Sequence, residues 1–575
     1  MYQMSDKTKS RIQDKLVFLY GETKGIRAFN ELEKVLEGFI KKNKTRNLQK
    51  GFNEKDIILI TYGDMIKNKK RPLQILSVFA KRYLRNKINS IHILPFFEYY
   101  SDRGFSIIDY KKADSRIGYW EDVKELKKNF KLMFDLVLNH ISDKHFWFQE
   151  FLKGNPKFQN YFIWFSKDNL PPEKILKKVF RPRATPLLTK YITTIGEKYV
   201  WTTFPLKQID LNFKNEEVLL EIIDIILFYI EKGADIIRLD AIAFVWKELG
   251  TNCVHLKQAH VIVQLLRDIL DVVAPKVAII TETNVPHKEN IEYWGDGKNE
   301  AQMVYNFSLP PLVVNSIHTG NSMNISKWAD NLETKSNEVT FFNFLDTHDG
   351  IGVLGAKGIL SDAEIEKMVE RSENNGGFTG YRKNPDGTES PYEMNTTWWS
   401  IINTDNEGSD DLEIQIKRYL VSRSIALCLK GVPGIYLNGL LGAVNDRVGA
   451  KESGNRRDIN RKNFKSKDLL KKIDDKNSRI HRVFFCYLDL IEKRITEKAF
   501  HPNGDQEILF LNDAIFSIIR TSLDKKDVIV ALHNLSNEKQ QIKLNENSYY
   551  DILSRRSYGK NIELPPYHIL WLKSL

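Results

Sequence analysis

Cysteine is scarce in this chain of 575 residues, which contains only Cys253, Cys428 and Cys486. Three cysteines so far apart provide neither a disulfide framework nor a metal-ligand spacing, and they favour a reducing, cytoplasmic setting. The sequence also lacks a G-x-G-x-x-G turn, a P-loop and a calcium-binding loop. We therefore expect neither a metal nor an organic cofactor.

The chain has no uninterrupted apolar segment of membrane-spanning length. Its longest apolar run, VLLEIIDIILFYI (218–230), is interrupted by Glu221 and Asp224. The first residues, MYQMSDKTKSRIQDKL, contain no apolar signal core. The run therefore predicts an amphipathic helix, and no membrane partner is expected.

Positive charge is only slightly in excess of negative charge. Lys and Arg number 86 against 74 Asp and Glu, a formal net charge of +12, and the basic residues are scattered. The densest runs, KKNKTRNLQK (41–50) and KNKKRP (67–72), are not interleaved with aromatic residues. This pattern is typical of a solvated surface, so no nucleic-acid partner is expected.

What the sequence does contain is a succession of short apolar strands, each separated from the next by a helix-like stretch. Alternating strand and helix implies parallel βα units, and eight units close a (β/α)8 TIM barrel, an α/β fold. The strands are expected at IILITYGD (57–64), SIHILPF (90–96), KLMFDLVLNH (131–140), ADIIRLDA (234–241), VAIITETN (277–284), QMVYNF (302–307), VTFFNFLDTHD (339–349) and GVPGIYLNG (431–439).

Other segments surround the expected barrel, which takes residues 56–143 and 214–505. Residues 1–55 form a charged, helical N-terminal extension that could cap the bottom of the barrel or join a dimer interface. Two interruptions are too long for ordinary loops: an inserted B-type domain at 144–213, after strand three, and a loop at about 350–397, after strand seven. Both are expected to overhang the mouth. Residues 506–575 predict an antiparallel β domain.

Charged residues interrupt the stretch DIIRLDAIAF (235–244), which otherwise is typical of a strand inside a parallel sheet. An unpaired buried charge is costly, and Arg238 and Asp240, two residues apart on a strand, point the same way. Active sites of such barrels are built where the strands end, so these side chains predict a site at the mouth. Polar residues at other expected strand ends are His140, Glu282, His348 and Asp349.

Three acids at the ends of different strands, Asp240, Glu282 and Asp349, suit cleavage of a glycosidic bond with retention. This reaction needs a carboxylate nucleophile and a carboxylic acid roughly 5 Å apart. The acid protonates the departing oxygen and then acts as a base. Arg238 is expected to keep the nucleophile ionised, because an adjacent cation lowers a carboxylate's pKa. The two histidines are expected to donate to sugar hydroxyls.

The motifs DLVLNH, IRLDA, ITETN and FLDTHD, in this order, resemble those of the α-amylase superfamily of (β/α)8 glycosidases and transglycosylases. The resemblance covers roughly residues 57–575. It implies that Asp240 is the nucleophile, Glu282 the general acid/base and Asp349 the transition-state stabiliser. It also implies that His140, Arg238 and His348 bind substrate.

Further segments are similar to the sucrose phosphorylase subfamily. SDRGFSIIDY (101–110) implies glucose-binding roles for Asp102 and Phe105, YVWTTFPLKQIDLN (199–212) for Phe204, and RRDINR (456–461) for Arg457. FRPR (180–183) and PYEMN (391–395) imply that Arg183 and Tyr392 lie on acceptor-side loops. The resemblance implies a hexosyltransferase in which phosphate replaces water as the acceptor, with α-glucose 1-phosphate as product. The fork of Arg183 suits a phosphate dianion.

The aglycone, the group that leaves, is the open point. AFVWKELGTNCVHLKQAH (243–260), GDGKNEAQMVYNFSLPPL (295–312) and the N-terminal extension resemble the branch acting on glucosylglycerate. Glu393 stands where sucrose-specific members carry a neutral amide. Its carboxylate should disfavour an anionic aglycone unless a cation offsets it, and Arg181, Arg183 or Lys383 could be that cation.

Several alternatives remain open at this stage. Sucrose, sucrose 6-phosphate and glucosylglycerol are the other candidate substrates of a phosphorylase. A hydrolase or transglucosidase of the same fold would share the same catalytic residues. A non-enzymatic barrel that binds a membrane partner is disfavoured, because all three acids are present and no span is found. A homodimer is left open.

Overall fold

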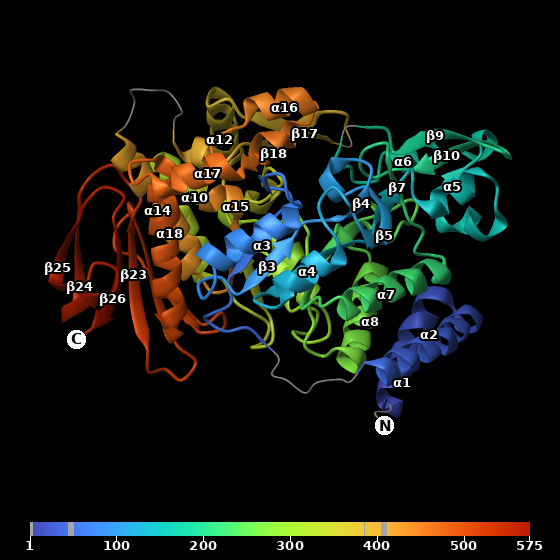
Figure 1. Cartoon of the computed structure of the whole chain (residues 1–575), viewed down its shortest axis with the longest axis horizontal. Helices are drawn as coiled ribbons and strands as arrows, with labels where there is room; N and C mark the ends of the chain where they lie inside the picture. Colours follow the sequence, from blue (N-terminus) through green and yellow to red (C-terminus); the bar gives the residue numbers. More distant parts are fainter. Residues whose placement is uncertain (1–3, 44–50, 184, 385, 404–410) are drawn as a thin grey trace.

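The computed structural model describes residues 4–43, 51–183, 185–384, 386–403 and 411–575. Eight parallel strands form a closed barrel at its centre, in the order β1-β19-β15-β14-β13-β12-β6-β3 (Figure 1). The fold class and all eight strand positions expected from the sequence are confirmed. The strands are β1 (Ile58–Thr61), β3 (Ser90–Ile93), β6 (Lys131–Val137), β12 (Ile236–Asp240), β13 (Ala278–Thr281), β14 (Met303–Tyr305), β15 (Thr340–Asn343) and β19 (Val432–Tyr436).

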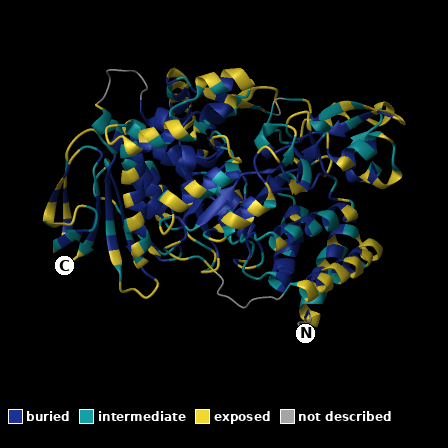
Figure 2. Cartoon of the chain, in the orientation of Figure 1, coloured by how far each residue is buried: buried dark blue, intermediate teal, exposed yellow. Residues whose placement is uncertain are grey.

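Apart from Lys131, which is exposed at the start of β6, the barrel strands are buried along their lengths, and helices enclose them (Figure 2). The run at 218–230 forms part of α7 (Glu216–Glu231), which begins where the side chain of Asn215 accepts from the backbone N–H of Glu217. None of the helices in the described ranges is long and apolar enough to cross a membrane. The other enclosing helices include α3 (Pro72–Tyr83), α4 (Trp120–Lys127), α8 (Lys257–Val273), α10 (Leu309–Thr319), α14 (Leu412–Cys428) and α18 (Arg479–Thr496).

The segment after β6 lies over the mouth of the barrel and has a small sheet of its own. Its outer part is the antiparallel sheet β8-β10-β9, formed by β8 (Trp164–Phe165), β9 (Leu188–Thr193) and β10 (Gly196–Trp201). Its return strand, β11 (Gln208–Asp210), pairs with β7 (His140–Ser142) directly beyond the end of β6. This pairing holds the insertion against the barrel.

A buried lysine strengthens the junction between insertion and barrel. The Nζ of Lys247 lies 2.8 Å from an Asp210 carboxylate oxygen and donates to Asn139 Oδ1 at 2.6 Å. Asp210 also accepts from the backbone N–H of Thr203 at 2.7 Å. The lysine charge is therefore compensated, as a buried charge requires.

The segment after β15 supplies the opposite side of the mouth. It contains α12 (Asp362–Asn374) and an antiparallel sheet in the order β16-β18-β17, formed by β16 (Ile351–Gly352), β17 (Phe378–Lys383) and β18 (Glu389–Asn395). Because β18 carries Tyr392 and Glu393, this sheet brings the expected acceptor-side residues to the mouth.

The chain ends in a six-stranded antiparallel sheet of order β21-β22-β23-β26-β24-β25, as the sequence predicts. Ser424 of α14 takes part in its contact with the barrel: the Ser424 hydroxyl lies 2.8 Å from His533 Nε2 and accepts from the indole N–H of Trp571 at 3.1 Å. The strands are β21 (Asp505–Leu509), β22 (Ile515–Thr521), β23 (Val528–Asn534), β24 (Gln540–Asp551), β25 (Arg556–Leu564) and β26 (Ile569–Ser574).

The N-terminal extension is a helical hairpin made of α1 (Asp6–Tyr20) and α2 (Glu22–Lys42). The chain reverses at Gly21, whose φ of 78° is one that glycine adopts without strain. The hairpin packs against α7 and α8 on the side of the barrel (Figure 1). It is held there in part by ion pairs of Lys15 with Asp268 (2.6 Å) and of Arg27 with Glu216.

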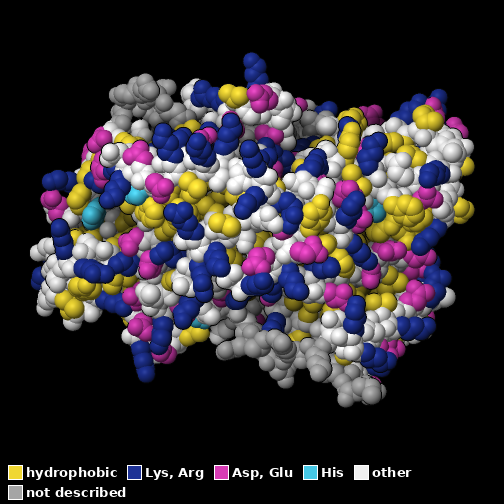
Figure 3. Space-filling view, in the orientation of Figure 1, with side chains coloured by type: hydrophobic (Ala, Val, Ile, Leu, Met, Phe, Trp, Pro, Cys, Tyr) yellow, Lys and Arg dark blue, Asp and Glu magenta, His cyan; other side chains and the backbone are white. Residues whose placement is uncertain are grey.

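Basic side chains on the visible face of the molecule are interspersed with acidic and hydrophobic ones (Figure 3). They do not gather into one basic patch on this face, in keeping with a solvated surface.

Candidate active site

Asp240 is the last residue of β12, and Arg238 lies two residues earlier on the same side of that strand. The Nη1 of Arg238 donates to Asp240 Oδ1 at 2.7 Å and to Asp135 Oδ1 at 2.6 Å. Its Nε donates to the Tyr305 hydroxyl at 3.1 Å. Arg238 is 1% exposed, so its charge is fully committed to these partners. The charges in the strand are therefore part of a site at the mouth of the barrel.

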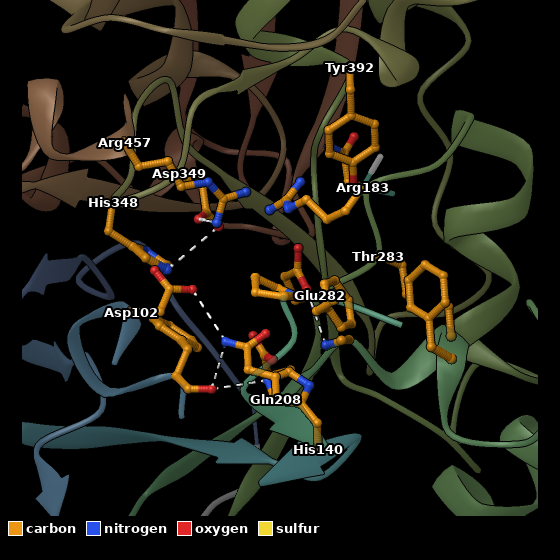
Figure 4. A pocket seen from close by; sticks show the side chains of 18 of the residues that line it. Asp102, His140, Arg183, Gln208, Glu282, Thr283, His348, Asp349, Tyr392 and Arg457 are labelled. Atoms are coloured by element: carbon orange, nitrogen blue, oxygen red, sulfur yellow. Dashed lines mark hydrogen bonds and ion pairs between the residues drawn. The ribbon is translucent and has the colours of Figure 1, made fainter. Parts of the chain in front are cut away.

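A pocket opens at this end of the barrel, and nearly all the residues expected from the sequence line it (Figure 4). Arg238 and Glu393 are the exceptions: they are not among the lining residues and are buried beside it. The expected residues that line the pocket are Asp102, Phe105, His140, Arg183, Phe204, Asp240, Glu282, His348, Asp349, Tyr392 and Arg457.

Glu282 follows β13 and lies close to the end of the neighbouring strand β12. Its Oε2 accepts from the backbone N–H of Ala241 at 3.2 Å and is 3.9 Å from Arg238 Nη2. Burial raises the pKa of Glu282 to about 7, and the nearby carboxylates of Asp240 and Asp349 add to the rise. A carboxyl group with this pKa is protonated in much of the population at neutral pH, as a general acid must be.

The direction of the Asp240 pKa differs from the sequence-based expectation. Burial raises the pKa of Asp240, while Arg238 and His140 act against the rise. Arg238 does lower the pKa of Asp240, as expected. Its Nη1 is shared, however, because the same atom also binds Asp135. The dry surroundings of Asp240 therefore outweigh the influence of Arg238.

The two histidines of the pocket are kept neutral. Burial lowers the pKa of both His140 and His348. The His348 ring stacks on Phe105 with centroids 4.8 Å apart, and the Phe204 ring lies 5.1 Å from that of His140. His140 Nε2 is 3.0 Å from the Phe105 carbonyl oxygen. A sugar hydroxyl that accepts a hydrogen bond from this nitrogen must therefore replace the carbonyl.

Asp349 stays ionised because arginines surround it. Burial alone would raise its pKa, but Arg457 and Arg461 lower the pKa of Asp349 below its ordinary range. Arg457 Nη1 lies 2.5 Å from Asp349 Oδ1, and Arg461 Nη2 lies 3.7 Å from the same oxygen. An ionised carboxylate here is able to accept sugar hydroxyls throughout the reaction.

Arg457 also forms a two-pronged pair with Glu393. Its Nε donates to Oε1 at 3.0 Å and its Nη2 to Oε2 at 2.7 Å. The cation paired with Glu393 is thus Arg457, which the sequence placed beside glucose; Arg183, one of the three basic residues proposed from the sequence, also acts on Glu393 and lowers its pKa from further away. Arg181 instead donates to the Thr185 carbonyl, at 2.5 Å. Despite its burial, the pKa of Glu393 is lowered by Arg457.

Arg183 and Tyr392 meet on the side of the pocket away from Asp102 and His348 (Figure 4). The Arg183 guanidinium lies over the Tyr392 ring at 5.7 Å, and its Nη1 donates to the Pro182 carbonyl at 3.1 Å. Within the part of the chain that is described, no carboxylate forms an ion pair with Arg183. Its charge is therefore available to a ligand.

Sequence reasoning missed residues that support the site from behind. Asp135 was inside the motif DLVLNH and links Arg238 to His92 Nε2, which is 2.6 Å away. Arg461 ended the motif RRDINR and pairs with Asp102 at 3.3 Å. Gln208 donates to the Phe105 carbonyl at 3.1 Å. The motifs contained these residues, but their partners lie too far away in sequence to be read from spacing.

No group of three or more His, Cys, Asp and Glu side chains suited to a metal ion occurs among the described residues. The pocket offers a buried carboxyl group beside an arginine, a carboxylic acid with a pKa near neutral, and a third, ionised carboxylate. On a (β/α)8 barrel this constellation suits an enzyme that cleaves glycosidic bonds.

The α-amylase catalytic-domain family matches residues 82–368, and the chain belongs to this family. The chain is 42% identical over 537 residues to a glucosylglycerate phosphorylase from Spirochaeta thermophila, covering 92% of this chain and 90% of that one. It is 39% identical over 568 residues to a glucosylglycerate phosphorylase from Escherichia coli, covering 98% and 100%.

Solved structures agree with this assignment. The crystal structure of sucrose 6F-phosphate phosphorylase from Thermoanaerobacter thermosaccharolyticum superposes with a TM-score of 0.73 at 25% identity, covering 89% of this chain and 98% of that one. The resemblance inferred from the motifs is therefore confirmed.

Proposed function

We propose that the protein is a retaining glucosylglycerate phosphorylase, which converts 2-O-α-glucosylglycerate and inorganic phosphate into α-glucose 1-phosphate and glycerate. The identities of 39–42% to glucosylglycerate phosphorylases over nearly the whole chain support this substrate. The one observation in the site that carries it is the charge at its acceptor end. Glu393 is paired with Arg457, while Arg183 lines the pocket and forms no ion pair with a carboxylate of the described residues.

In the first step, a carboxylate oxygen of Asp240 attacks the anomeric carbon and forms a glucosyl ester. The bond from that carbon to the aglycone oxygen breaks, and Glu282 transfers its proton to this oxygen. Arg238 holds the attacking carboxylate in place through its 2.7 Å hydrogen bond. Asp349, ionised between two arginines, binds sugar hydroxyls as the ring flattens.

In the second step, a phosphate oxygen attacks the same carbon from the face that the aglycone left. The ester bond to Asp240 breaks, and Glu282, now a carboxylate, takes up the phosphate proton where one is present. Two inversions give net retention, so the product is the α-phosphate. Since phosphate enters where glycerate left, the same cation, Arg183, is placed to bind both anions in turn.

Other functions of the same fold predict different acceptors. Sucrose, sucrose 6-phosphate and glucosylglycerol phosphorylases would use the same three acids. A hydrolase or transglucosidase would need no free cation at the acceptor end, and Arg183 therefore favours phosphorolysis. A purely structural barrel would have no need of a carboxyl group whose pKa is raised to about 7 inside a pocket.

Phosphate is the proposed co-substrate, and no metal or organic cofactor takes part in the proposed reaction. A cytoplasmic location and a homodimer stay predictions from the sequence.

The test is a transfer assay in the synthetic direction. The protein is incubated with α-glucose 1-phosphate and glycerate, glycerol, fructose, fructose 6-phosphate or water alone, and phosphate release is followed. Fast release with glycerate is expected. Fast release with another acceptor would identify that acceptor as the aglycone instead of glycerate. Release with water alone would show that the protein is a hydrolase. Asp240→Asn, which removes the nucleophile, should release no phosphate with any acceptor.

A further inference from the structure

His92 is a buried histidine of the barrel that the proposed reaction does not use. It lies on β3, its side chain has no exposed surface, and it is not among the residues that line the active-site pocket. Placing an imidazole among apolar strands is costly unless it binds a polar partner. The partner of His92 is Asp135 of β6, which is equally buried.

Asp135 connects His92 to the arginine of the site. Its two carboxylate oxygens have different partners: Oδ2 lies 2.6 Å from His92 Nε2, and Oδ1 accepts from Arg238 Nη1 at 2.6 Å. Burial alone would raise the pKa of Asp135, but His92 and Arg238 lower it. The carboxylate is therefore ionised and only accepts hydrogen bonds, so His92 Nε2 is the donor in this contact.

The arginine nitrogen that binds Asp135 also binds the proposed nucleophile. Arg238 Nη1 donates to Asp240 Oδ1 at 2.7 Å, so two carboxylates share one nitrogen. His92 occupies the second oxygen of Asp135 and so fixes the plane of that carboxylate. Without this donor, Asp135 would be free to turn both oxygens toward Arg238 and to draw the guanidinium away from Asp240.

We propose that His92 is a positioning residue that acts through Asp135 on Arg238 and so holds the attacking carboxylate in place. The inference rests on the proposed function, since it takes Asp240 to form the glucosyl ester. His92 contacts neither the sugar nor the acceptor in this account, because its side chain lies outside the pocket lining. Its effect therefore belongs to the chemical step and not to substrate binding.

The first test replaces His92 by leucine, which removes the donor and keeps a buried side chain. With 2-O-α-glucosylglycerate and phosphate, kcat should fall about ten- to a hundredfold, while KM for each substrate changes by less than about twofold. His92→Gln places an amide N–H near the former Nε2 and should recover most of this activity. A loss that falls on KM, or an equal loss in both variants, would overturn the inference.

The acid limb of the pH profile is a second readout, which a purely structural residue would not move. Asp240 must be ionised to attack, and burial raises its pKa while Arg238 opposes the rise. If His92→Leu lets Arg238 move away, the acid limb of kcat/KM for the glucoside should shift upward by about 0.5–1 pH unit. The charged and titratable groups that face Asp240 are Arg238 on its own strand, Asp135 of β6, His140 of β7 and Glu282 after β13.

Ser90→Ala is the matched control on the same strand. Ser90 is 1% exposed like its neighbours, but its hydroxyl donates to Asn89 and not to Asp135. This variant should leave kcat and the acid limb unchanged. In an Asp135→Asn background, His92→Leu should add little further loss, because the link to Arg238 is already broken. Fully additive losses would overturn the route through Asp135.

Thermal unfolding of each variant separates a folding defect from a positioning defect. If His92→Leu does not fold, His92→Asn takes its place, since its shorter amide ends too far from Asp135 and should lose the activity that His92→Gln keeps. A folded variant without the donor that retains wild-type kcat and an unshifted acid limb would make the inference wrong while the proposed function stands. A wild-type protein that transfers glucose to none of the acceptors would overturn the proposed function and the inference with it.

Discussion

At the scale of single residues, the site separates three carboxyl groups by their surroundings. Glu282 has only a distant arginine at 3.9 Å and burial raises its pKa, whereas Asp349 lies 2.5 Å from Arg457 and its pKa is lowered. Groups whose environments push their pKa values apart take different roles in one reaction. The proposed acid, Glu282, and the proposed stabiliser, Asp349, are thus distinguished by their arginine contacts.

The pKa of Glu282 predicts the alkaline limb of the pH profile. Because the protonated acid is needed when the aglycone departs, kcat/KM for the glucoside should fall about tenfold per pH unit above about pH 7. Glu282→Gln should lose this limb and most activity. A glucosyl donor with a good leaving group should restore formation of the glucosyl ester, measured as a burst of leaving group; no restoration would contradict the assignment.

The free charge of Arg183 predicts a selective defect. Arg183→Ala should raise KM for phosphate at least about tenfold, because a two-pronged charged contact is lost. Hydrolysis of an uncharged donor in the absence of phosphate, such as α-glucosyl fluoride, should be affected less, because no anion then occupies the acceptor end. Arg183→Lys, which keeps the charge but not the fork, should lie in between. Equal losses in phosphorolysis and hydrolysis would mark Arg183 as a structural residue of its loop.

The residues themselves could be found from the sequence, but their pairings could not. The acids Asp240, Glu282 and Asp349 stand in recognisable motifs at strand ends, and the motifs alone are enough to predict that they share one site. The bond between Arg457 and Glu393 spans 64 positions, and the pairing of Arg461 with Asp102 spans 359. Such contacts depend on how distant loops pack, which residue spacing does not encode.

At the scale of secondary-structure elements, the barrel strands were predictable because they are buried on both faces and therefore continuously apolar. The expected runs extend beyond the strands themselves, as in 131–140 against β6, which ends at Val137. The polar residues of such a run that follow the strand lie at the mouth of the barrel. The small sheets over the mouth were not predicted in detail, since their strands, such as β8 and β16, are only two residues long.

The N-terminal hairpin is an element whose role is testable through stability. Leu16 of α1 is fully buried, and Leu16→Ala should lower the free energy of unfolding by about 2–5 kcal/mol. The loss should appear in thermal unfolding, with KM for the glucoside unchanged, because the hairpin packs on α7 and α8 and is not part of the pocket lining. Val35→Ala in α2, where the side chain is 43% exposed, is the control and should change little. A changed KM in Leu16→Ala would indicate a direct link to the site.

At the scale of the whole molecule, buried neutral histidines are spread over three regions. Burial lowers the pKa of His145 to about 3, of His318 to about 3 and of His533 to about 4. His145 belongs to the insertion, His318 to α10 and His533 to the C-terminal sheet. None of these three lies in the active-site pocket.

These histidines predict acid sensitivity. In the unfolded chain an imidazole takes up a proton below about pH 6.5, but in the folded protein these three do so only near pH 3–4. The unfolded state thus binds more protons as the pH falls through this window, and stability is lost from about pH 6.5 downward. The unfolding temperature should be several degrees lower at pH 5 than at pH 7, and His533→Gln should reduce the difference. An unfolding temperature that does not change with pH would contradict this.

The wall of the pocket behind the glucose side is closed by ion pairs, Arg461 with Asp102 at 3.3 Å and Arg103 with Asp458 at 3.1 Å, and the side chain of Arg461 has no exposed surface. We expect such a wall to stop a polymer from threading through the pocket. An enzyme built in this way would act on one terminal glucosyl unit per encounter and release it completely, without sliding along a glucan chain.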